Sequence, residues 1–122
     1  MAKYANPSDK RVRKIVYEKY DGKCAYCGTE LFDVFTIDHI IPKRRNMDYS
    51  QLPTGKDEIE NYNPCCYSCN SSKSSFSIEK WRGELQQKYE RLLKYDGTFR
   101  LLVRFGIVKR VREKVIFHFE NP

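Results

Sequence analysis

The fold of this chain is decided by the stretch KCAYCG at residues 23–28 and by its counterpart NPCCYSCN at residues 63–70. Each stretch carries two cysteines separated by two residues, the spacing with which a tight turn presents two thiolates to one zinc ion. The four expected ligands are Cys24, Cys27, Cys66 and Cys69. We therefore predict a structural zinc site, which contributes on the order of 10 kcal/mol of apparent folding free energy.

The total number of cysteines also favours metal binding. The chain has five cysteines, and an odd number fits poorly with a closed disulfide framework. A redox-active CxxC pair is the competing interpretation, but it would not explain two copies of the motif. The fifth cysteine, Cys65, is expected to be a small buried residue.

Hydropathy and charge bound the compartment and the partner. The N-terminal sequence MAKYANPSDKRVRK lacks the apolar core of a signal peptide, and no run approaches the roughly 18 apolar residues of a membrane span. We therefore expect a cytoplasmic protein without a membrane partner, in a reducing compartment where paired cysteines bind metal. The formal net charge of +7 favours nucleic acid as the partner. No pattern indicates the oligomeric state.

Residue patterns predict the elements around the first cysteine pair. Ser8 is expected to cap a helix that runs to about Tyr20, with a basic face that contacts either phosphate or solvent. The stretch VFTIDHIIP at residues 34–42 is rich in β-branched residues and predicts a strand. An irregular loop is expected from Lys43 to about Glu60.

Two further helices are expected after the second cysteine pair. Ser77 is expected to cap a long helix that ends at Asp96-Gly97, and a second helix is expected over residues 98–105. The alternating stretch KVIFHFE at residues 114–120 predicts a final strand, in which His118 has no catalytic role. The apolar positions of the long helix recur every three or four residues and are expected in the core: Ile78, Trp81, Leu85, Tyr89, Leu92 and Leu93.

The residues between the cysteine pairs resemble those of the HNH endonuclease family. The stretches TIDHIIP at residues 36–42 and NYNPCCYSCNSSK at residues 61–73 carry Asp-His, a middle Asn, Pro64 and a last Asn in the order of the family motif. The last position is Asn70 rather than His, so the chain resembles the HNN variant. The C-terminal part is similar to small standalone HNH proteins of bacteriophages and prophages, which implies a bacterial host cell.

The resemblance implies an α+β fold with a small ββα-metal core. In this fold the four-cysteine zinc site staples the core, and helices flank it at both ends, with a short C-terminal strand. We expect a single HNH nuclease domain over residues 1–122. Its parts are an N-terminal basic helix (1–22), the zinc-knuckled core (23–76) and the C-terminal helices and strand (77–122).

The resemblance also implies a metal-dependent DNA endonuclease. Asp38 and Asn70 would supply oxygen ligands to Mg²⁺ or Mn²⁺, and His39 would take a proton from the attacking water. Asn61 would orient that imidazole and brace the motif. The implied products carry a 5′ phosphate and a 3′ hydroxyl, and the expected substrate is double-stranded DNA.

Several basic residues near this motif are candidates for phosphate contact. They are Lys43, Arg44, Arg45 and Lys73. Their alternative interpretation, as solvated surface charges, stays open on the sequence alone. The leading alternative for the whole chain is a non-catalytic, zinc-stapled nucleic-acid binding module. Such a module would have no use for Asp38, His39 and Asn70 as a set.

Overall fold

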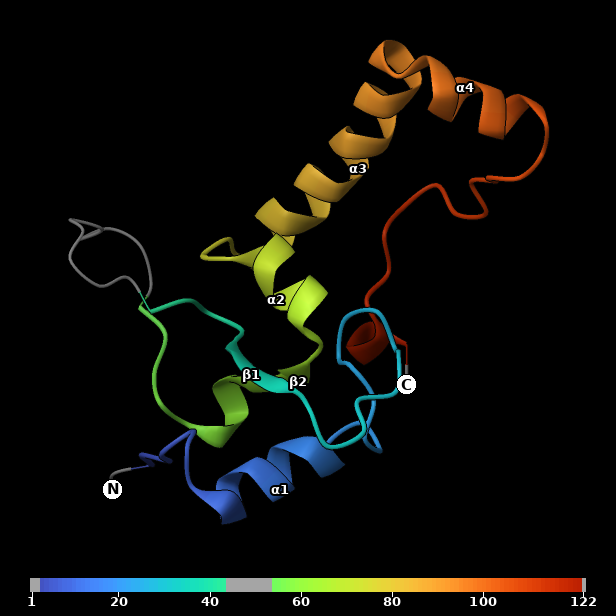
Figure 1. Cartoon of the computed structure of the whole chain (residues 1–122). Helices are drawn as coiled ribbons and strands as arrows, with labels where there is room; N and C mark the ends of the chain where they lie inside the picture. Colours follow the sequence, from blue (N-terminus) through green and yellow to red (C-terminus); the bar gives the residue numbers. More distant parts are fainter. Residues whose placement is uncertain (1–2, 44–53, 122) are drawn as a thin grey trace.

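The structure is a computed structural model that describes residues 3–43 and 54–121 (Figure 1). Arg44 and Arg45, two of the candidate phosphate contacts, lie outside the described residues. Within those residues a two-stranded sheet lies above the N-terminal helix in Figure 1, and two helices lead upward from it to a further helix at the top. None of the described helices is both long and apolar enough to cross a membrane.

Helix α1 (Lys10–Glu18) forms close to its predicted place, but a different residue caps it. The side chain of Asp9, not Ser8, accepts a hydrogen bond from the backbone N–H of Arg11 at 2.8 Å. Aspartate caps a helix as well as serine does, so the start shifts by one residue. Part of the basic face has a structural use, because the guanidinium of Arg13 donates to the carbonyl of Phe35 at 3.0 Å.

The sheet pairs β1 (Thr36–His39) with β2 (Tyr62–Cys65) in antiparallel register, so that Asp38 lies opposite Asn63. Strand β1 is shorter than the predicted stretch of residues 34–42. It ends at His39 because the N–H groups of Ile40 and Ile41 both donate to Asn61, the residue that precedes β2, so the strand ladder does not continue. That residue closes a short 3₁₀ helix, η1 (Ile59–Asn61).

Three helices follow β2, and the predicted cap of the long one is confirmed. After α2 (Tyr67–Lys73), the hydroxyl of Ser77 accepts from the N–H of Lys80 at 3.2 Å and starts α3 (Ile78–Tyr95). Helix α4 (Gly97–Arg104) then begins at Asp96, whose side chain accepts from the N–H of Phe99.

The apolar stripe of α3 enters the core only near its start, which corrects the expectation for the whole stripe. Trp81 is 2% exposed, whereas Leu92 is 41% exposed. The reason is that α3 leads away from the sheet (Figure 1), so its far end meets α4 and Arg110 instead of the core. There the rings of Tyr89 and Phe99 pack edge-on, with centroids 5.6 Å apart.

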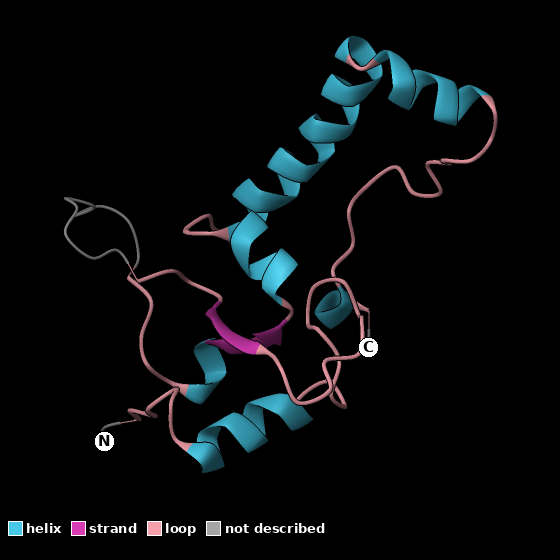
Figure 2. Ribbon diagram, in the orientation of Figure 1, coloured by secondary structure: helices cyan, strands magenta, loops and turns pink. Residues whose placement is uncertain are grey.

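The predicted C-terminal strand is wrong. Residues 114–117 pair with no strand, and the chain ends in a short 3₁₀ helix, η2 (His118–Glu120), as Figure 2 shows. The N–H groups of His118 and Phe119 donate instead to carbonyls in the first cysteine turn, at 3.0 and 2.8 Å. Phe117 stacks on Trp81, with centroids 4.7 Å apart, so the alternating apolar residues close the core without a ladder. The prediction that Cys65 is buried is confirmed.

Candidate active site and cysteine cluster

The four paired cysteines form one cluster that fits a zinc ion. The Sγ atoms of Cys24, Cys27, Cys66 and Cys69 all lie within 4.8 Å of one another. Four thiolates that bind zinc at about 2.3 Å have S–S separations of about 3.8 Å in a tetrahedron. The Sγ atoms of Cys27 and Cys66 are 3.8 Å apart, and no disulfide joins them. The cluster therefore supports the predicted structural zinc site.

Tight turns of the backbone aim N–H groups at these sulfurs. The N–H groups of Tyr26 and Cys66 lie 3.4 Å from Sγ of Cys24, and that of Cys69 lies 3.4 Å from Sγ of Cys66. Gly28 closes the first turn with a φ of +77°, a conformation that other residues disfavour. Such N–H donors favour the thiolate, which is the form of cysteine that binds metal.

A second site lies between the end of β1 and α2. It is a pocket of about 200 Å³ lined by Ile37, Asp38, His39, Pro42, Lys43, Asn70, Ser74 and Ser75. Three residues that the sequence singled out meet here: Asp38 and His39 on β1, and Asn70 on α2. Neighbouring strand residues usually face opposite sides. Both carboxylate and imidazole reach this pocket because it lies where β1 ends and the chain turns.

Asp38 is held tightly through one of its two carboxylate oxygens. The side chain is nearly buried, and its Oδ2 atom accepts from the Tyr26 hydroxyl at 2.5 Å. The ammonium of Lys73 lies 3.1 Å from the same Oδ2. Burial raises the pKa of Asp38, and the charges and hydrogen bonds of Lys73 and Tyr26 oppose that rise. The oxygen left for other ligands is Oδ1, which accepts no hydrogen bond from the described residues.

Lys73 is buried beneath the pocket. Its side chain is 0% exposed, so it does not project into solvent. The ammonium donates to the carbonyl of His39 at 2.9 Å and pairs with Asp38. A buried ammonium needs such partners because its desolvation is costly. Lys73 therefore joins α2 to β1 beneath the pocket, and its contact with nucleic acid stays a prediction.

The imidazole of His39 is oriented by a residue that sequence reasoning missed. Its Nε2 atom lies 2.8 Å from Oδ1 of Asp57, and its ring packs edge-on against Tyr62. The other carboxylate oxygen of Asp57 accepts from Lys43 at 2.8 Å. Hydrogen bonds from Lys43 and His39 lower the pKa of Asp57 to about 2. No pattern in the sequence distinguished Asp57 from the neighbouring Glu58.

Lys43 is the one candidate phosphate contact that the described residues leave partly open. Its side chain is 27% exposed and lines the pocket, although Asp57 binds its ammonium. Phosphate contact by Lys43 stays a prediction.

Asn61 braces the backbone beside the pocket. Its side-chain oxygen accepts from the N–H of Ile41 at 2.9 Å, and its amide nitrogen donates to the carbonyls of Ile41 and Lys56, both at 3.1 Å. Within the described part of the chain, none of its hydrogen bonds reaches the His39 imidazole. The geometry thus fits the expected bracing, while Asp57 takes the orienting part.

Gly55 allows this bracing because it lies directly against the carbonyl of Ile41. A Cβ atom at Gly55 would lie 1.7 Å from that carbonyl oxygen and 3.0 Å from the amide nitrogen of Asn61. The position of Gly55 is also fixed by its N–H, which donates to the carbonyl of Pro42 at 2.9 Å. Only glycine fits this close approach.

Comparison with known proteins agrees with this geometry. Residues 24–76 match the family model described as HNH endonuclease. The chain is 34% identical over 82 residues to the SPbeta prophage-derived candidate HNH endonuclease YoqL of Bacillus subtilis (strain 168), a stretch that covers 62% of this chain and 34% of YoqL. The chain thus spans about a third of the length of that relative. No solved structure matches this chain. The segment that holds both the cysteine cluster and the pocket is thus similar to the HNH endonuclease family.

Proposed function

We propose that this protein is a metal-dependent endonuclease that hydrolyses phosphodiester bonds of double-stranded DNA. The observation that carries the proposal is the convergence of Asp38, His39 and Asn70 on one small pocket. A phosphodiester resists hydrolysis because its charge repels a nucleophile and its alkoxide is a poor leaving group. A base for water and a cation at the leaving oxygen address both problems. The family of residues 24–76 supports this class of reaction.

The donor set in the pocket fits a hard divalent cation. Oδ1 of Asp38 and the side-chain oxygen of Asn70 would hold Mg²⁺ or Mn²⁺, which prefer oxygen ligands and keep open positions for water and phosphate. When bound, such an ion stabilises the negative charge that develops on the leaving 3′ oxygen. The four-cysteine cluster suits zinc instead, because thiolates are soft ligands.

His39 acts as the general base in this proposal. Because the Asp57 carboxylate can only accept, it favours the tautomer in which Nε2 of His39 carries the proton. Nδ1 then has a lone pair that can take a proton from water. The water oxygen forms a bond to phosphorus, the bond from phosphorus to the 3′ oxygen breaks, and the leaving 3′ oxygen takes a proton from solvent. The products carry a 5′ phosphate and a 3′ hydroxyl. Asn61 keeps the loop next to His39 in place.

The direct test is plasmid cleavage by the wild-type protein and the His39→Ala variant. Both are incubated with supercoiled plasmid and Mg²⁺ or Mn²⁺, and the ends of the products are mapped. We expect nicked or linear DNA with 5′ phosphates from the wild type and a loss of roughly 10²-fold or more in rate with the variant. Equal rates for the two proteins would contradict the role of His39. The ratio of nicked to linear plasmid distinguishes cleavage of one strand from cleavage of both.

The second candidate function is a zinc-stapled module that binds nucleic acid without cutting it. One observation favours it: the Lys73 ammonium already neutralises part of the Asp38 charge that a divalent ion would use. The module predicts a salt-dependent gel shift with no nicking across a series of divalent ions. Cleavage that His39→Ala abolishes decides against it.

A further inference from the structure

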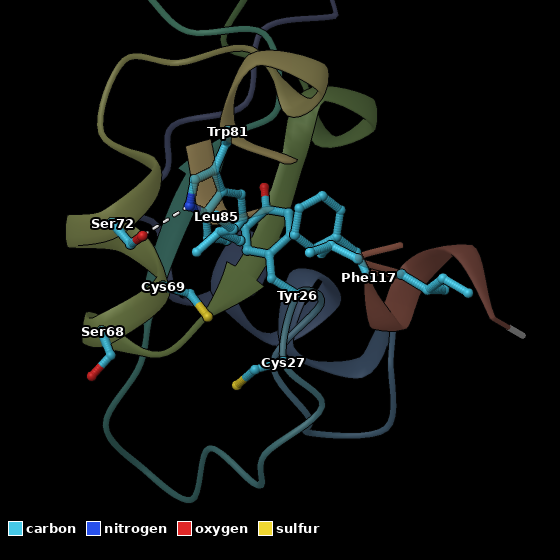
Figure 3. Close-up of a pocket in the computed structure, with 10 residues that line it drawn as sticks. Tyr26, Cys27, Ser68, Cys69, Ser72, Trp81, Leu85 and Phe117 are labelled. Atoms are coloured by element: carbon cyan, nitrogen blue, oxygen red, sulfur yellow. Dashed lines mark hydrogen bonds between the residues drawn. The ribbon is translucent and has the colours of Figure 1, made fainter. Parts of the chain in front are cut away.

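Tyr26 connects the cysteine cluster to the core by its position in the chain. It lies between Cys24 and Cys27 and is only 3% exposed. Its ring packs edge-on against Trp81 and Phe117, with centroids 5.1 and 5.7 Å apart. Figure 3 shows the Tyr26 ring beside these two side chains, in a pocket that Cys27 and Cys69 also line. The first cysteine turn and the core therefore fix where the Tyr26 ring lies.

The Tyr26 hydroxyl directs its proton at Asp38. It donates to Oδ2 of Asp38 at 2.5 Å. The amide nitrogen of Asn63, a fully buried residue that faces Asp38 across the sheet, donates to the same hydroxyl at 3.4 Å. An amide N–H can only donate, and a hydroxyl has a single proton. The hydroxyl therefore accepts from Asn63 and gives its proton to Asp38.

The two donors on Oδ2 set the rotation of the carboxylate. Lys73 binds this oxygen from α2, and Tyr26 binds it from the first cysteine turn. Oδ1 of Asp38 has no such partner among the described residues, and Asp38 lines the pocket shared with Asn70. A carboxylate held at one oxygen presents the other in a fixed direction.

We propose that Tyr26 is a positioning residue, which couples the cysteine cluster to the divalent-metal site by holding Asp38 so that Oδ1 faces the pocket. The inference rests on the proposed function only in taking Asp38 as a ligand of the divalent ion. Partners that orient metal ligands typically change metal affinity by about 10- to 100-fold when they are removed. The Tyr26 hydroxyl is such a partner.

The test measures Mn²⁺ binding without DNA, so that it does not depend on cleavage. Free Mn²⁺ is titrated by electron paramagnetic resonance in the zinc-loaded wild type, Tyr26→Phe and Tyr67→Phe. Tyr67 is the matched control, because it lies in the second cysteine turn and its side chain is exposed. We expect Tyr26→Phe to weaken Mn²⁺ binding roughly tenfold at an unchanged ratio of zinc to protein, with no change for Tyr67→Phe. Equal affinity in all three proteins overturns the proposal.

A urea double-mutant cycle tests the contact itself, even where Tyr26→Phe lowers stability. It compares the wild type, Tyr26→Phe, Asp38→Asn and the double variant. The proposal expects Tyr26→Phe to lower the free energy of unfolding less when Asp38→Asn is already present. Additive effects overturn the direct coupling.

Cleavage is scored separately, so that failure of the proposed function can be recognised. One outcome would support the coupling and contradict the nuclease. In it, the wild type binds Mn²⁺ through Asp38 and Tyr26→Phe binds Mn²⁺ more weakly, but the wild type leaves the plasmid intact. Mn²⁺ binding that Asp38→Asn does not weaken overturns the coupling.

Discussion

The Nε2 atom of His39 lies 2.8 Å from Oδ1 of Asp57, and the other oxygen of Asp57 lies 2.8 Å from the ammonium of Lys43. The carboxylate therefore orients the imidazole and a basic side chain of the same pocket at once. His39 is the last residue of β1 and Lys43 lies just after it, whereas Asp57 is on the segment that returns to β2. One carboxylate thus joins the segment before β2 to the proposed catalytic base and to Lys43.

Asp57→Asn is expected to slow DNA cleavage by about 10²-fold. The amide can offer an N–H to Nε2 of His39, which stabilises the tautomer that has its proton on Nδ1 and therefore cannot take one there. Single-turnover cleavage rates of the wild type and the variant check this. Glu58→Gln is the control, since it removes a neighbouring charge without touching His39. Equal slowing by both substitutions would indicate a general effect of charge.

The same carboxylate makes part of the stability depend on pH. The pKa of Asp57 is lowered from 3.8 to about 2 in the folded protein. A lowered folded-state pKa contributes stability above the unfolded value, and this contribution is lost as pH falls from about 4 to 2. We expect the difference in unfolding free energy between the wild type and Asp57→Asn to be constant above about pH 5 and to shrink below pH 4. Urea unfolding across this range, with zinc content followed in both proteins, measures the difference.

Gly55→Ala should destabilise the protein by more than about 2 kcal/mol, because the new Cβ would lie 1.7 Å from a backbone oxygen. It should also reduce cleavage, since that oxygen belongs to the segment braced by Asn61. Gly83→Ala is the matched control: a Cβ there has no neighbour within 4 Å. Its position inside α3 predicts a gain of about 0.5–1 kcal/mol. Thermal unfolding of both variants checks whether stability falls in Gly55→Ala and rises in Gly83→Ala.

Arg82→Met should lower the free energy of unfolding by about 1–3 kcal/mol. The Arg82 guanidinium is largely buried and binds both carboxylate oxygens of Glu120 and the carbonyl of Val115. These contacts join α3 to the C-terminal segment that covers the core. Arg91→Met, on the exposed part of the same helix, should change stability by less than about 0.5 kcal/mol. Urea titrations of the two variants compare the effects.

Cys66→Ser should lower the zinc content and unfold much of the domain. Cys66 supplies one of the four clustered thiolates and also caps α2 by accepting from the N–H of Cys69. Binding of a structural zinc is coupled to folding, so losing a ligand lowers both together. Zinc-to-protein ratios and circular dichroism measure the two quantities. Cys65→Ser is the control, because Cys65 lies outside the cluster. A full zinc ratio in Cys66→Ser would contradict the assignment.

The sequence predicted those contacts that form between residues close together in the chain. The two-residue spacing of each cysteine pair requires a tight turn, so the cluster could be predicted without a structure. The helix cap of Ser77 is equally local. Asp38, His39 and Asn70 were predicted as site residues because their order resembles a family motif, and all three line the pocket.

Contacts between distant segments escaped prediction for a physical reason. The pairing of Asp57 with His39, and of Lys73 with Asp38, depends on which loop returns beside which strand. A lysine on a short helix also looks the same in sequence whether it is solvated or buried. The strand predicted from the alternating apolar residues at 114–120 was wrong for a related reason. Its apolar residues pack on Trp81 and its N–H groups bond to the first cysteine turn, so the segment needs no partner strand.

Helix α3 lies in the core near its start, at Trp81, and ends at Tyr95, which is 74% exposed. Amide hydrogen exchange should therefore divide this one helix. The N–H groups near Trp81 should exchange only when the whole domain opens, because packing there is shared with the C-terminal segment. Those in the last turns should exchange through local fraying, at rates that zinc removal scarcely changes. A continuous helix thus crosses from the globally cooperative part of the molecule into a part that opens by itself.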